Sequence, residues 1–514
     1  MKNDEISAAW AYHNGTKHSL QSIRVNRHYL DWQNQPLPFK IYRNIEPMRL
    51  PEQLSSSGIP ALSALSGSTS DEGRSLLTRQ SLAEILFLSA GITRRRTYPG
   101  GEMLFRAAAC TGALYHIDLY IVGALEDLAA GVYQFSPQDF ALRKLRDGDF
   151  RSVLIQVSGE EPSIATAPCV VVCASTFWRN AWKYQSRAYR HCFWDTGTIV
   201  ANLLAAASAR EILANVVAGF VDTAVSRLLG LDAAREAPIA LVALGNTAHP
   251  ATEAAVFVAP LHIETEPLSA TEVDYPAMRR MHEASELQSA AEVKAWRDQT
   301  TEAQAKRDGQ PIGRSFMLHP LDAAALPNDT VEDVIVRRGS TRAFAREPIT
   351  FEQLSIVLER ATGALSTDFL TGSQPSLNDI YLIVHAVTEL PSGAYFFQRD
   401  QRVLELFKEG DFRQEAGHLG LGQEIPADCS VNIYFLADLD RALARFGNRG
   451  YRAAQLEAGI IGGKIYLAAY AQRLGASGLT FFDDDVTEFF SPHAAGKSVM
   501  FLVALGKSAK KRIG

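Results

Sequence analysis

The sequence predicts an α+β fold that is written twice in one chain. Four segments of the first half return in the second at a nearly constant offset, for example 449 − 187 = 262 and 502 − 241 = 261 residues. Short β-branched and aromatic runs, typical of strands, are mixed with long helical stretches and do not alternate with them one for one. A repeat of this length is a whole domain, so we expect a covalent pseudo-dimer. The repeated pairs are Asp118–Val122 and Asp379–Ile383, Gly131–Phe135 and Gly393–Phe397, Arg187–Arg190 and Arg449–Arg452, and Leu241–Gly245 and Leu502–Gly506.

The composition is that of an ordinary globular protein. The 514 residues are 47% hydrophobic and 21% charged, and the net charge of −6 excludes an electrostatic footprint for nucleic acid. The N-terminus has no apolar core of a signal peptide, and the apolar stretch 196–220 is interrupted by charged and amide residues. We therefore expect a cytoplasmic protein without a membrane segment. The five cysteines show no CxxC spacing and no histidine cluster, which favours core residues over disulfides or a metal site.

Four regions are expected along the chain. Residues 1–60, whose five prolines begin at Pro36, are predicted to be an extended lead-in over a surface. Residues 61–250 form the first domain and residues 331–514 the second. Between them, residues 251–330 are a polar linker with one helical tract at Ala277–Arg297.

Each domain is predicted to contain the same elements in the same order, because helical periodicity and short apolar runs recur at matching places. The first should contain a helix at Ser81–Ala90, strands at Leu119–Val122, Val132–Phe135 and Val170–Val172, helices at Asn180–Tyr189 and Thr196–Ala209, and a strand at Ile239–Leu244. The second should contain a helix at Phe351–Arg360, strands at Ile380–Val384, Ala394–Phe397 and Val431–Leu436, a helix at Ala454–Arg473, and a strand at Val499–Leu505.

The two halves differ most where the second domain opens. There the tripeptide Gly339–Thr341 matches Gly67–Thr69 at an offset of 339 − 67 = 272 residues, but the charges around it do not match. Arginine forks, a serine hydroxyl and backbone N–H groups together bind a terminal phosphate. The second half alone is thus predicted to hold an anion, the alternative being a solvated basic approach to a helix. The unmatched cations are Arg337, Arg338 and Arg342, which face Leu65, Ser66 and Ser70, and Lys507 and Lys510, which face Asn246 and His249.

These motifs resemble the flavin-dependent nitroreductase superfamily, in which an Arg-Arg-Ser-x-Arg segment clamps the FMN phosphate. More narrowly, the chain resembles the SagB-type dehydrogenases, or azoline oxidases. The matching segments are Tyr12–Ser19, Tyr29–Trp32, Lys183-Tyr184, Arg187–Arg190, Asp195-x-Gly197 and residues 228–232. The resemblance covers both halves. It implies two tandem nitroreductase-like domains of α+β class that form an intramolecular pseudo-dimer, with FMN at the seam between them.

Two stretches depart from the family pattern. The loop Pro-Ser-x-Gly-x-Leu-Tyr-Pro reads Ala-Cys-Thr-Gly-Ala-Leu-Tyr-His at 109–116 and is shortened to Gln-Pro-Ser-Leu-Asn at 374–378. The stretch Gly-Phe-x-Asp, which in the family places a backbone amide beside the flavin, is kept at Gly219–Asp222 but reads Thr-Phe-Phe-Asp at 480–483.

The resemblance implies a composite site. The expected cofactor-binding residues are Arg337, Arg338, Ser340, Arg342, Thr480 and Lys507 from the second half, and Cys110, Thr111 and Gly112 from the first. Lys183 and Tyr184 form the expected catalytic pair. The second half has Arg445-Phe446 in their place, so the mirror-image site lacks both the clamp and the pair, and one FMN per chain is expected.

The implied reaction is oxidation of azoline to azole rings in a modified peptide, with Lys183 as base and Tyr184 as proton donor. A neutral Lys183 at pH 7 needs its pKa lowered by about 3 units from ~10.4. Considered without the resemblance, a surface lysine beside a packing tyrosine is the alternative. Arg187 and Arg190 are expected to be structural, pairing with acidic neighbours such as Asp195. Trp178, Trp182 and Trp194 are expected in the core, with an aromatic lid over the flavin as the alternative.

Two other functions stay open. One is a nitro- or quinone reductase on the same fold, which needs a nicotinamide donor but not Lys183. The other is a non-catalytic scaffold in a peptide-modifying complex. A small-molecule or peptide substrate is the expected partner, and further pairing of the chain into a homodimer is left open.

Overall fold

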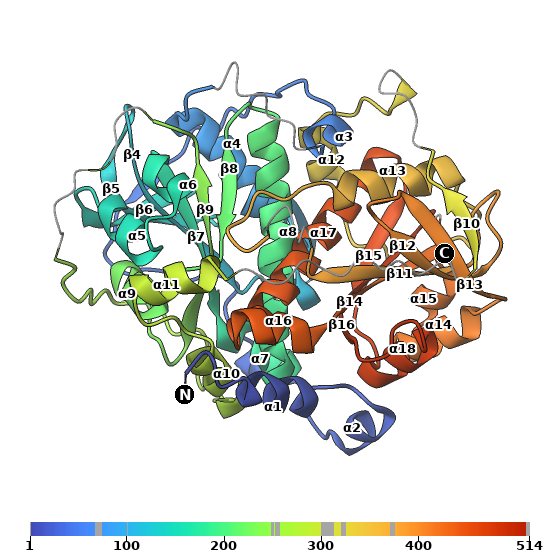
Figure 1. Cartoon of the computed structure of the whole chain (residues 1–514). Coiled ribbons are helices and arrows are strands. Elements are labelled where there is room, and N and C mark those ends of the chain that lie inside the picture. Colours follow the sequence, from blue (N-terminus) through green and yellow to red (C-terminus); the bar gives the residue numbers. More distant parts are fainter. Residues whose placement is uncertain are drawn as a thin grey trace.

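The computed structural model describes residues 2–66, 75–99, 101–247, 251, 257–299, 313–319, 325–370 and 376–509. Two seven-stranded sheets flank a central pair of long helices, as Figure 1 shows. Their strand orders are β1-β6-β5-β4-β7-β9-β8 and β10-β13-β12-β11-β14-β16-β15. The two orders are the same topology used twice, so the predicted α+β fold of two tandem domains is confirmed.

The first domain contains the following elements. The helices are α3 (Ala61–Ala64), α4 (Arg79–Ala90), α5 (Arg151–Val157), α6 (Pro162–Thr166), α7 (Phe177–Tyr184), α8 (Ala188–Ser208) and α9 (Asp222–Leu229), with short 3-10 turns η2 (Thr111–Ala113) and η3 (Gln185–Arg187). The strands are β1 (Pro47–Arg49), the hairpin β2 (Ile92–Tyr98) and β3 (Gly101–Arg106), and β4 (Ile117–Leu125), β5 (Leu128–Ser136), β6 (Ala141–Asp147), β7 (Cys169–Thr176), β8 (Ala214–Val217) and β9 (Glu236–Leu244).

The second domain repeats this order. Its helices are α12 (Val331–Arg337), α13 (Phe351–Thr362), α14 (Arg413–Leu419), α15 (Glu424–Asp428), α16 (Leu439–Phe446), α17 (Arg449–Ala471) and α18 (Asp483–Phe490). Its strands are β10 (Arg314–Met317), β11 (Asn378–Val384), β12 (Gly393–Gln398), β13 (Val403–Glu409), β14 (Val431–Ala437), β15 (Gly475–Leu479) and β16 (Ser498–Gly506).

The predicted strands are the inner strands of the two sheets. They are apolar because helices cover them, and β7, β9 and β16 are buried along their whole length. The strands that were not predicted lie toward the edges, where one face meets solvent. Thus four of the seven residues of β6 are charged, namely Arg143, Lys144, Arg146 and Asp147. The strand is buried at its start and more exposed toward its end. Apolar runs alone therefore missed the outer strands.

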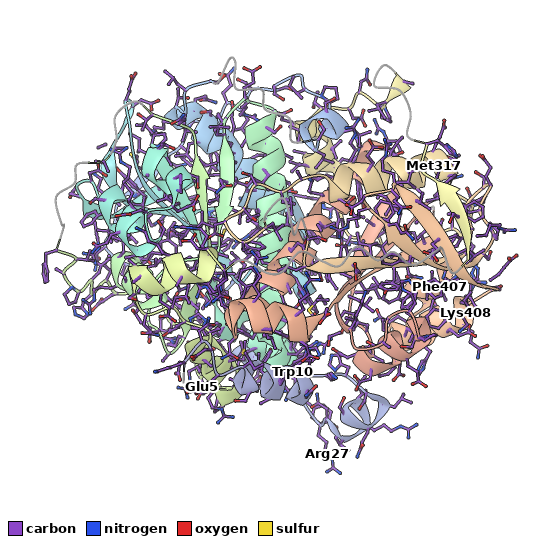
Figure 2. All side chains as sticks on the ribbon, viewed as in Figure 1. Glu5, Trp10, Arg27, Met317, Phe407 and Lys408 are labelled. Carbon is purple, nitrogen blue, oxygen red and sulfur yellow. The ribbon has the colours of Figure 1, made fainter. Side chains whose placement is uncertain are left out.

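The N-terminal lead-in differs from the extended chain that was predicted. Its first part is helical, with α1 (Ser7–Gly15) and α2 (Leu20–Val25), and a capping box at Ser19 starts the second helix. All five prolines follow residue 35, so nothing in the first part prevents a helix. Glu5 and Trp10 beside and on α1, and Arg27 beyond α2, lie along one edge of the molecule (Figure 2).

The linker also differs from the prediction. Where one helical tract was expected, the structure has two helices, α10 (Pro276–Ala284) and α11 (Ala290–Arg297). Ser289 accepts a hydrogen bond from the backbone N–H of Glu292 and caps the second helix. The turn between them allows α10 to pack against α1 while α11 turns toward α5.

The two domains meet along α8 and α17, which pack against each other between the sheets (Figure 1). Small residues bring the helices close together. A Cβ on Gly197 would lie 2.4 Å from the backbone of Gly459, and one on Gly463 would lie 2.6 Å from the Cβ of Ala201. No described helix has both the length and the apolar character that a membrane crossing requires.

Buried ion pairs cross the seam reciprocally. Arg187 and Arg190 of the first domain bind Asp483 of the second at 2.9 and 2.5 Å. The repeated segment does the converse, because Arg449 and Arg452 bind Asp222 at 2.6 and 2.8 Å. Such mutual contact is the property of a two-fold interface, here retained within one chain.

The expected pairing of Arg187 and Arg190 with Asp195 is therefore wrong. The arginines point across the seam, whereas the Asp195 carboxylate points toward the loop that follows β3. Burial opposes ionisation of Asp222, but Arg449 and Arg452 outweigh it and lower the pKa of this carboxyl to about 2. Burial and the arginine pair act on Asp483 in the same opposing ways, and its pKa is also lowered.

Candidate functional site

Lys183 and Tyr184 close helix α7 at the seam. The helix is held by a small apolar cluster of Leu114, Trp178, Trp182 and Leu268, against which Tyr184 packs. Trp178 and Trp182 are buried, as predicted, but in this small cluster and not in the main core. Trp194 does lie in the main core, and it donates a hydrogen bond to Gln455 across the seam. The Lys183 amine is half-buried and lies 5.4 Å from the centre of the Tyr184 ring.

The chain is strained directly after this pair. Gln185 has φ 51° and ψ −143°, a combination that residues other than glycine rarely adopt. Its counterpart, 447 − 185 = 262 residues later, is Gly447 with φ 63° and ψ −156°. The same bend is thus relaxed in the second domain and strained in the first, beside Lys183 and Tyr184. Asn26 of the lead-in donates a hydrogen bond of 2.9 Å to the Gln185 side chain.

The loop from Cys110 to Tyr115 lies against Tyr184. Gly112 has φ 65°, and a Cβ there would lie 2.8 Å from the Tyr184 hydroxyl, so glycine is required both by the backbone and by space. Asp195 of α8 fixes the loop. Its carboxylate accepts hydrogen bonds from the Cys110 thiol at 3.1 Å and from the Thr111 backbone and hydroxyl at 3.0 and 2.8 Å.

His116 is a third residue that binds Asp195, and it was not among the predicted site residues. Its Nε2 lies 2.9 Å from the carboxylate and its Nδ1 lies 2.9 Å from the Ser175 hydroxyl. The signal was present, because His116 and Cys110 are both departures from the family loop. The ligand atoms of Cys110, His116 and Asp195 lie within 4.8 Å of one another, a spacing that could hold a metal ion. Burial, and then Asp195, raise the pKa of the Cys110 thiol well above its usual value, so the group acts as a hydrogen-bond donor.

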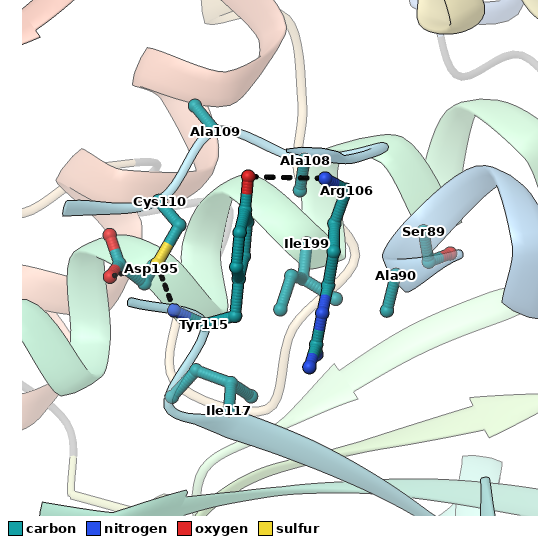
Figure 3. Close-up of a pocket in the computed structure, with 10 residues that line it drawn as sticks. All are labelled: Ser89, Ala90, Arg106, Ala108, Ala109, Cys110, Tyr115, Ile117, Asp195 and Ile199. Carbon is teal, nitrogen blue, oxygen red and sulfur yellow. Dashed lines mark hydrogen bonds between the residues drawn. The ribbon is translucent and has the colours of Figure 1, made fainter. Parts of the chain in front are cut away.

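A small cavity lies beneath this loop (Figure 3). Its volume is about 10 Å³, room for one water molecule and for no cofactor. Tyr115 separates the Cys110 side from the buried Arg106, whose guanidinium lies 5.0 Å from the centre of the Tyr115 ring. This cavity is therefore too small to be the cofactor site.

The predicted clamp residues lie on the second domain, and some of them already bind other protein groups. Arg337 donates hydrogen bonds to Asp329 at 2.6 Å and to the carbonyl of Tyr470 at 2.8 Å. Arg338 is buried and reaches across the seam, donating to the carbonyls of Ala107 at 2.9 Å and Arg106 at 3.1 Å. Arg338 thereby ties the clamp segment to the end of β3, next to the Cys110 loop.

The rest of the clamp segment lies beside the end of β16. Thr341 and Ala345 donate backbone hydrogen bonds to the carbonyls of Ala476 and Lys507, both at 2.9 Å. The chain thus brings Lys507, distant in sequence, next to the segment, although its amine also lies 3.5 Å from Glu347. The Ser340 hydroxyl lies 3.3 Å from that of Tyr466. Gly67–Ser70, His249, Pro375 and Lys510 lie outside the described residues.

Arg342 connects the two sides of the site electrostatically. Its guanidinium is exposed, and its charge is close enough to act on both Lys183 and Tyr184. Burial, and then Arg342, lower the pKa of the Lys183 amine. Burial, followed by Asp195 and Cys110, raises the pKa of Tyr184, so its hydroxyl keeps its proton. The arrangement therefore offers an amine that more readily becomes neutral beside a hydroxyl that can donate.

Thr480, the last predicted residue, follows β15. Its hydroxyl is buried and has no hydrogen-bond partner among the described residues. A buried polar atom without a partner is costly, and a ligand atom placed there would relieve that cost. The structure thus brings Cys110–Gly112, Lys183 and Tyr184 together with Arg342 at one seam. It places Arg338, Ser340 and Lys507 on the adjoining segments and directs Arg337 toward Asp329.

Comparisons with known proteins agree with this architecture. The model of the nitroreductase family matches residues 77–246 and again residues 335–507. A crystal structure of a protein described as a nitroreductase, from Anabaena variabilis, superimposes with a TM-score of 0.77 at 26% identity, covering 98% of this chain and 100% of that one.

Two curated relatives match about a third of the chain each. A protein named as a nitroreductase from Methanocaldococcus jannaschii is 25% identical over 171 residues, 33% of this chain and 81% of that protein. The microcin B17-processing protein McbC of Escherichia coli is 26% identical over 163 residues, 30% of this chain and 54% of McbC. The match therefore spans about half of McbC.

Proposed function

The chain belongs to the nitroreductase family, and we propose that it is an FMN-dependent oxidoreductase with one flavin at the seam between its two domains. The observation that carries the proposal is that the Arg342 charge of one domain acts on both Lys183 and Tyr184 of the other, while Gly112 lies against the Tyr184 hydroxyl. A cation suited to a phosphate and an acid–base pair would then serve one site.

The residues present fit the cofactor. Arg342, Ser340 and Lys507 are available to the phosphate, with Arg338 holding their segment against the first domain. The Gly112 loop and the Thr480 hydroxyl, which has no partner among the described residues, would border the ring. When bound, FMN supplies the acceptor for a hydride removed from the substrate.

The protein's own contribution is proton transfer. The Lys183 amine, made more acidic by burial and by Arg342, accepts a carbon-bound proton from the substrate. The Tyr184 hydroxyl, which stays protonated, donates a hydrogen bond that orients the reacting ring. Loss of a proton and a hydride from neighbouring atoms is the chemistry that turns an azoline into an azole. The likeness to the SagB-type dehydrogenases and to a microcin-processing protein supports a modified peptide as substrate.

Flavin stoichiometry tests the proposal directly. The purified chain, saturated with FMN and freed of excess, is expected to hold one FMN. Arg342→Ala should weaken retention, and Arg338→Ala with Arg342→Ala should abolish it. Arg346→Ala is the matched control, because Arg346 is exposed, lies in the same segment and pairs with Asp428. Two FMN per chain would refute the single composite site, and none under any condition would refute the cofactor.

A reductase of nitro or quinone compounds is the second candidate, favoured by the names of the relatives from M. jannaschii and A. variabilis. Such an enzyme takes its electrons from a nicotinamide and does not need Lys183. NAD(P)H-driven bleaching of the flavin that survives Lys183→Ala, with no turnover of an azoline peptide, would select it.

A further inference from the structure

The internal repeat relates the proposed flavin site, here called the first seam pocket, to a second position at the seam, here called the second seam pocket. The counterparts of Lys183 and Tyr184 are Arg445 and Phe446, and the counterpart of Thr480 is Gly219, since 446 − 184 = 262 and 480 − 219 = 261. In a symmetric dimer both pockets would hold the same ligand. In this chain the second one is filled by the protein itself.

An indole ring occupies the middle of the second pocket. Trp296 of α11 lies with its ring centre 5.0 Å from that of Phe446, and its indole N–H donates to the Phe446 carbonyl at 3.1 Å. On its other side, a Cβ on Gly219 would lie 2.9 Å from the indole ring. Trp296 is only 2% exposed. It lies next to both Phe446 and Gly219, the counterparts of Tyr184 and Thr480 in the first pocket.

A carboxylate occupies the edge of the same pocket. The backbone N–H groups of Ala218 and Gly219 both donate to Asp368, each at 2.8 Å. Gly219 keeps the family's glycine, whose amide is expected to face an acceptor atom of the flavin. Asp368 supplies that acceptor instead. Arg445, the counterpart of Lys183, donates a hydrogen bond of 3.1 Å to the carbonyl of Gln299.

The position of the linker explains why Trp296 occupies only one of the two related positions. The linker lies once in the chain, between the two domains, so it can reach one of the two related pockets. Helix α11 is fixed there by Arg297, which pairs with Glu161 at 2.9 Å and donates to the Gly159 carbonyl at 2.8 Å. In the first pocket the Thr480 hydroxyl has no partner among the described residues, whereas Gly219 is satisfied by Asp368.

We propose that the second seam pocket is a binding site for a planar heteroaromatic ring, kept occupied by the chain's own Trp296 and Asp368. It would take a flat ring against Phe446 with a ring acceptor toward the Gly219 N–H. A phosphate would find no counterpart of the clamp there, because the sequence has the uncharged Ser66 and Ser70 where the second domain has Arg338 and Arg342. The inference rests on the proposed seam site for its symmetry.

The test removes both occupants and offers a flavin ring without its phosphate tail. The variant Trp296→Gly with Asp368→Gly, first saturated with FMN, is titrated with lumiflavin by calorimetry and by absorbance of the washed protein. We expect one lumiflavin per chain in addition to FMN. Trp178→Gly is the control, since Trp178 is also buried but lies on α7, away from Phe446 and Gly219. It should bind no additional lumiflavin.

The outcomes separate this inference from the proposed function. A folded double variant that binds no more lumiflavin than the control would overturn the inference, whatever its FMN content. If the double variant does not fold alone, it is refolded with lumiflavin. Recovery of the native circular dichroism spectrum supports the pocket, and failure to recover overturns it. Absence of FMN from the wild-type chain would refute the proposed function but would leave the lumiflavin result to decide the second pocket.

Discussion

Asp222→Asn tests how much of the stability depends on the reciprocal ion pairs. The Asp222 carboxylate is completely buried and holds Arg449 and Arg452, while also accepting the backbone N–H of Leu287 at 3.2 Å. The amide has nearly the same shape, so it removes the charge without leaving a cavity. Two buried guanidiniums then lack their counterion, and the amide N–H₂ group points toward one of them.

The structure sets the size of the effect. Removing one partner of a buried, hydrogen-bonded ion pair costs about 3–5 kcal/mol. The lowering of the Asp222 pKa from 3.8 to about 2 leads to a figure of similar size. About two units at ~1.4 kcal/mol each correspond to roughly 2–3 kcal/mol of stabilisation at neutral pH. Asp483→Asn should cost a similar amount, because Asp483 holds the equivalent arginines in the other direction.

The pH dependence has a definite sign. Because folding lowers the pKa of Asp222, its stabilisation is fully present above the unfolded value near 3.8 and is lost as the pH falls through about 2. Between pH 7 and pH 3 the wild-type chain should lose about 1 kcal/mol of this contribution, whereas Asp222→Asn has none to lose. The difference in stability between the two proteins should therefore shrink by that amount.

The assay is urea unfolding followed by far-ultraviolet circular dichroism at pH 7 and pH 3. Asp484→Asn is the control, since Asp484 is exposed and pairs with Lys17 on the surface. It should change the free energy of unfolding by less than about 1 kcal/mol. The reasoning fails if Asp222→Asn costs no more than the control, or if its cost is the same at both pH values.

Three further predictions concern the proposed site. Lys183→Ala should lower kcat/KM for azoline oxidation by about 10²–10⁴-fold at unchanged FMN content, and activity equal to that of a surface Lys144→Ala variant would exclude Lys183 as the base. Arg342→Ala, measured with saturating FMN, removes a charge that lowers the pKa of Lys183, so the rising limb of kcat/KM should move to higher pH. An unmoved limb would show that another group titrates. Gln185→Gly should raise the free energy of unfolding by about 1 kcal/mol through relief of backbone strain and should lower kcat, and a destabilised variant would mean that the bend is not strained.

Local patterns in the sequence were sufficient for the architecture. The repeat at a nearly constant offset and the buried apolar strands followed from residue order alone, because burial on both faces leaves a run of apolar side chains. The outer strands, such as β6, were missed because a half-solvated strand carries charges that weaken this pattern. The helical start of the lead-in was missed because prolines that begin at Pro36 were taken to describe the residues before them.

The pairing of distant groups was decided only by the tertiary structure. Arg187 binds Asp483, 296 residues away, and not Asp195, eight positions along the chain, because the two domains turn their matching faces toward each other. His116 and Cys110 were known as departures from a loop pattern, but only the fold shows that they meet at one carboxylate. The sequence alone determined that the two halves are unequal, because the clamp arginines and the Lys183-Tyr184 pair each occur in one half. Which of the two related positions Trp296 occupies depended on where the single linker can reach, and that is a property of three-dimensional packing that no local periodicity carries.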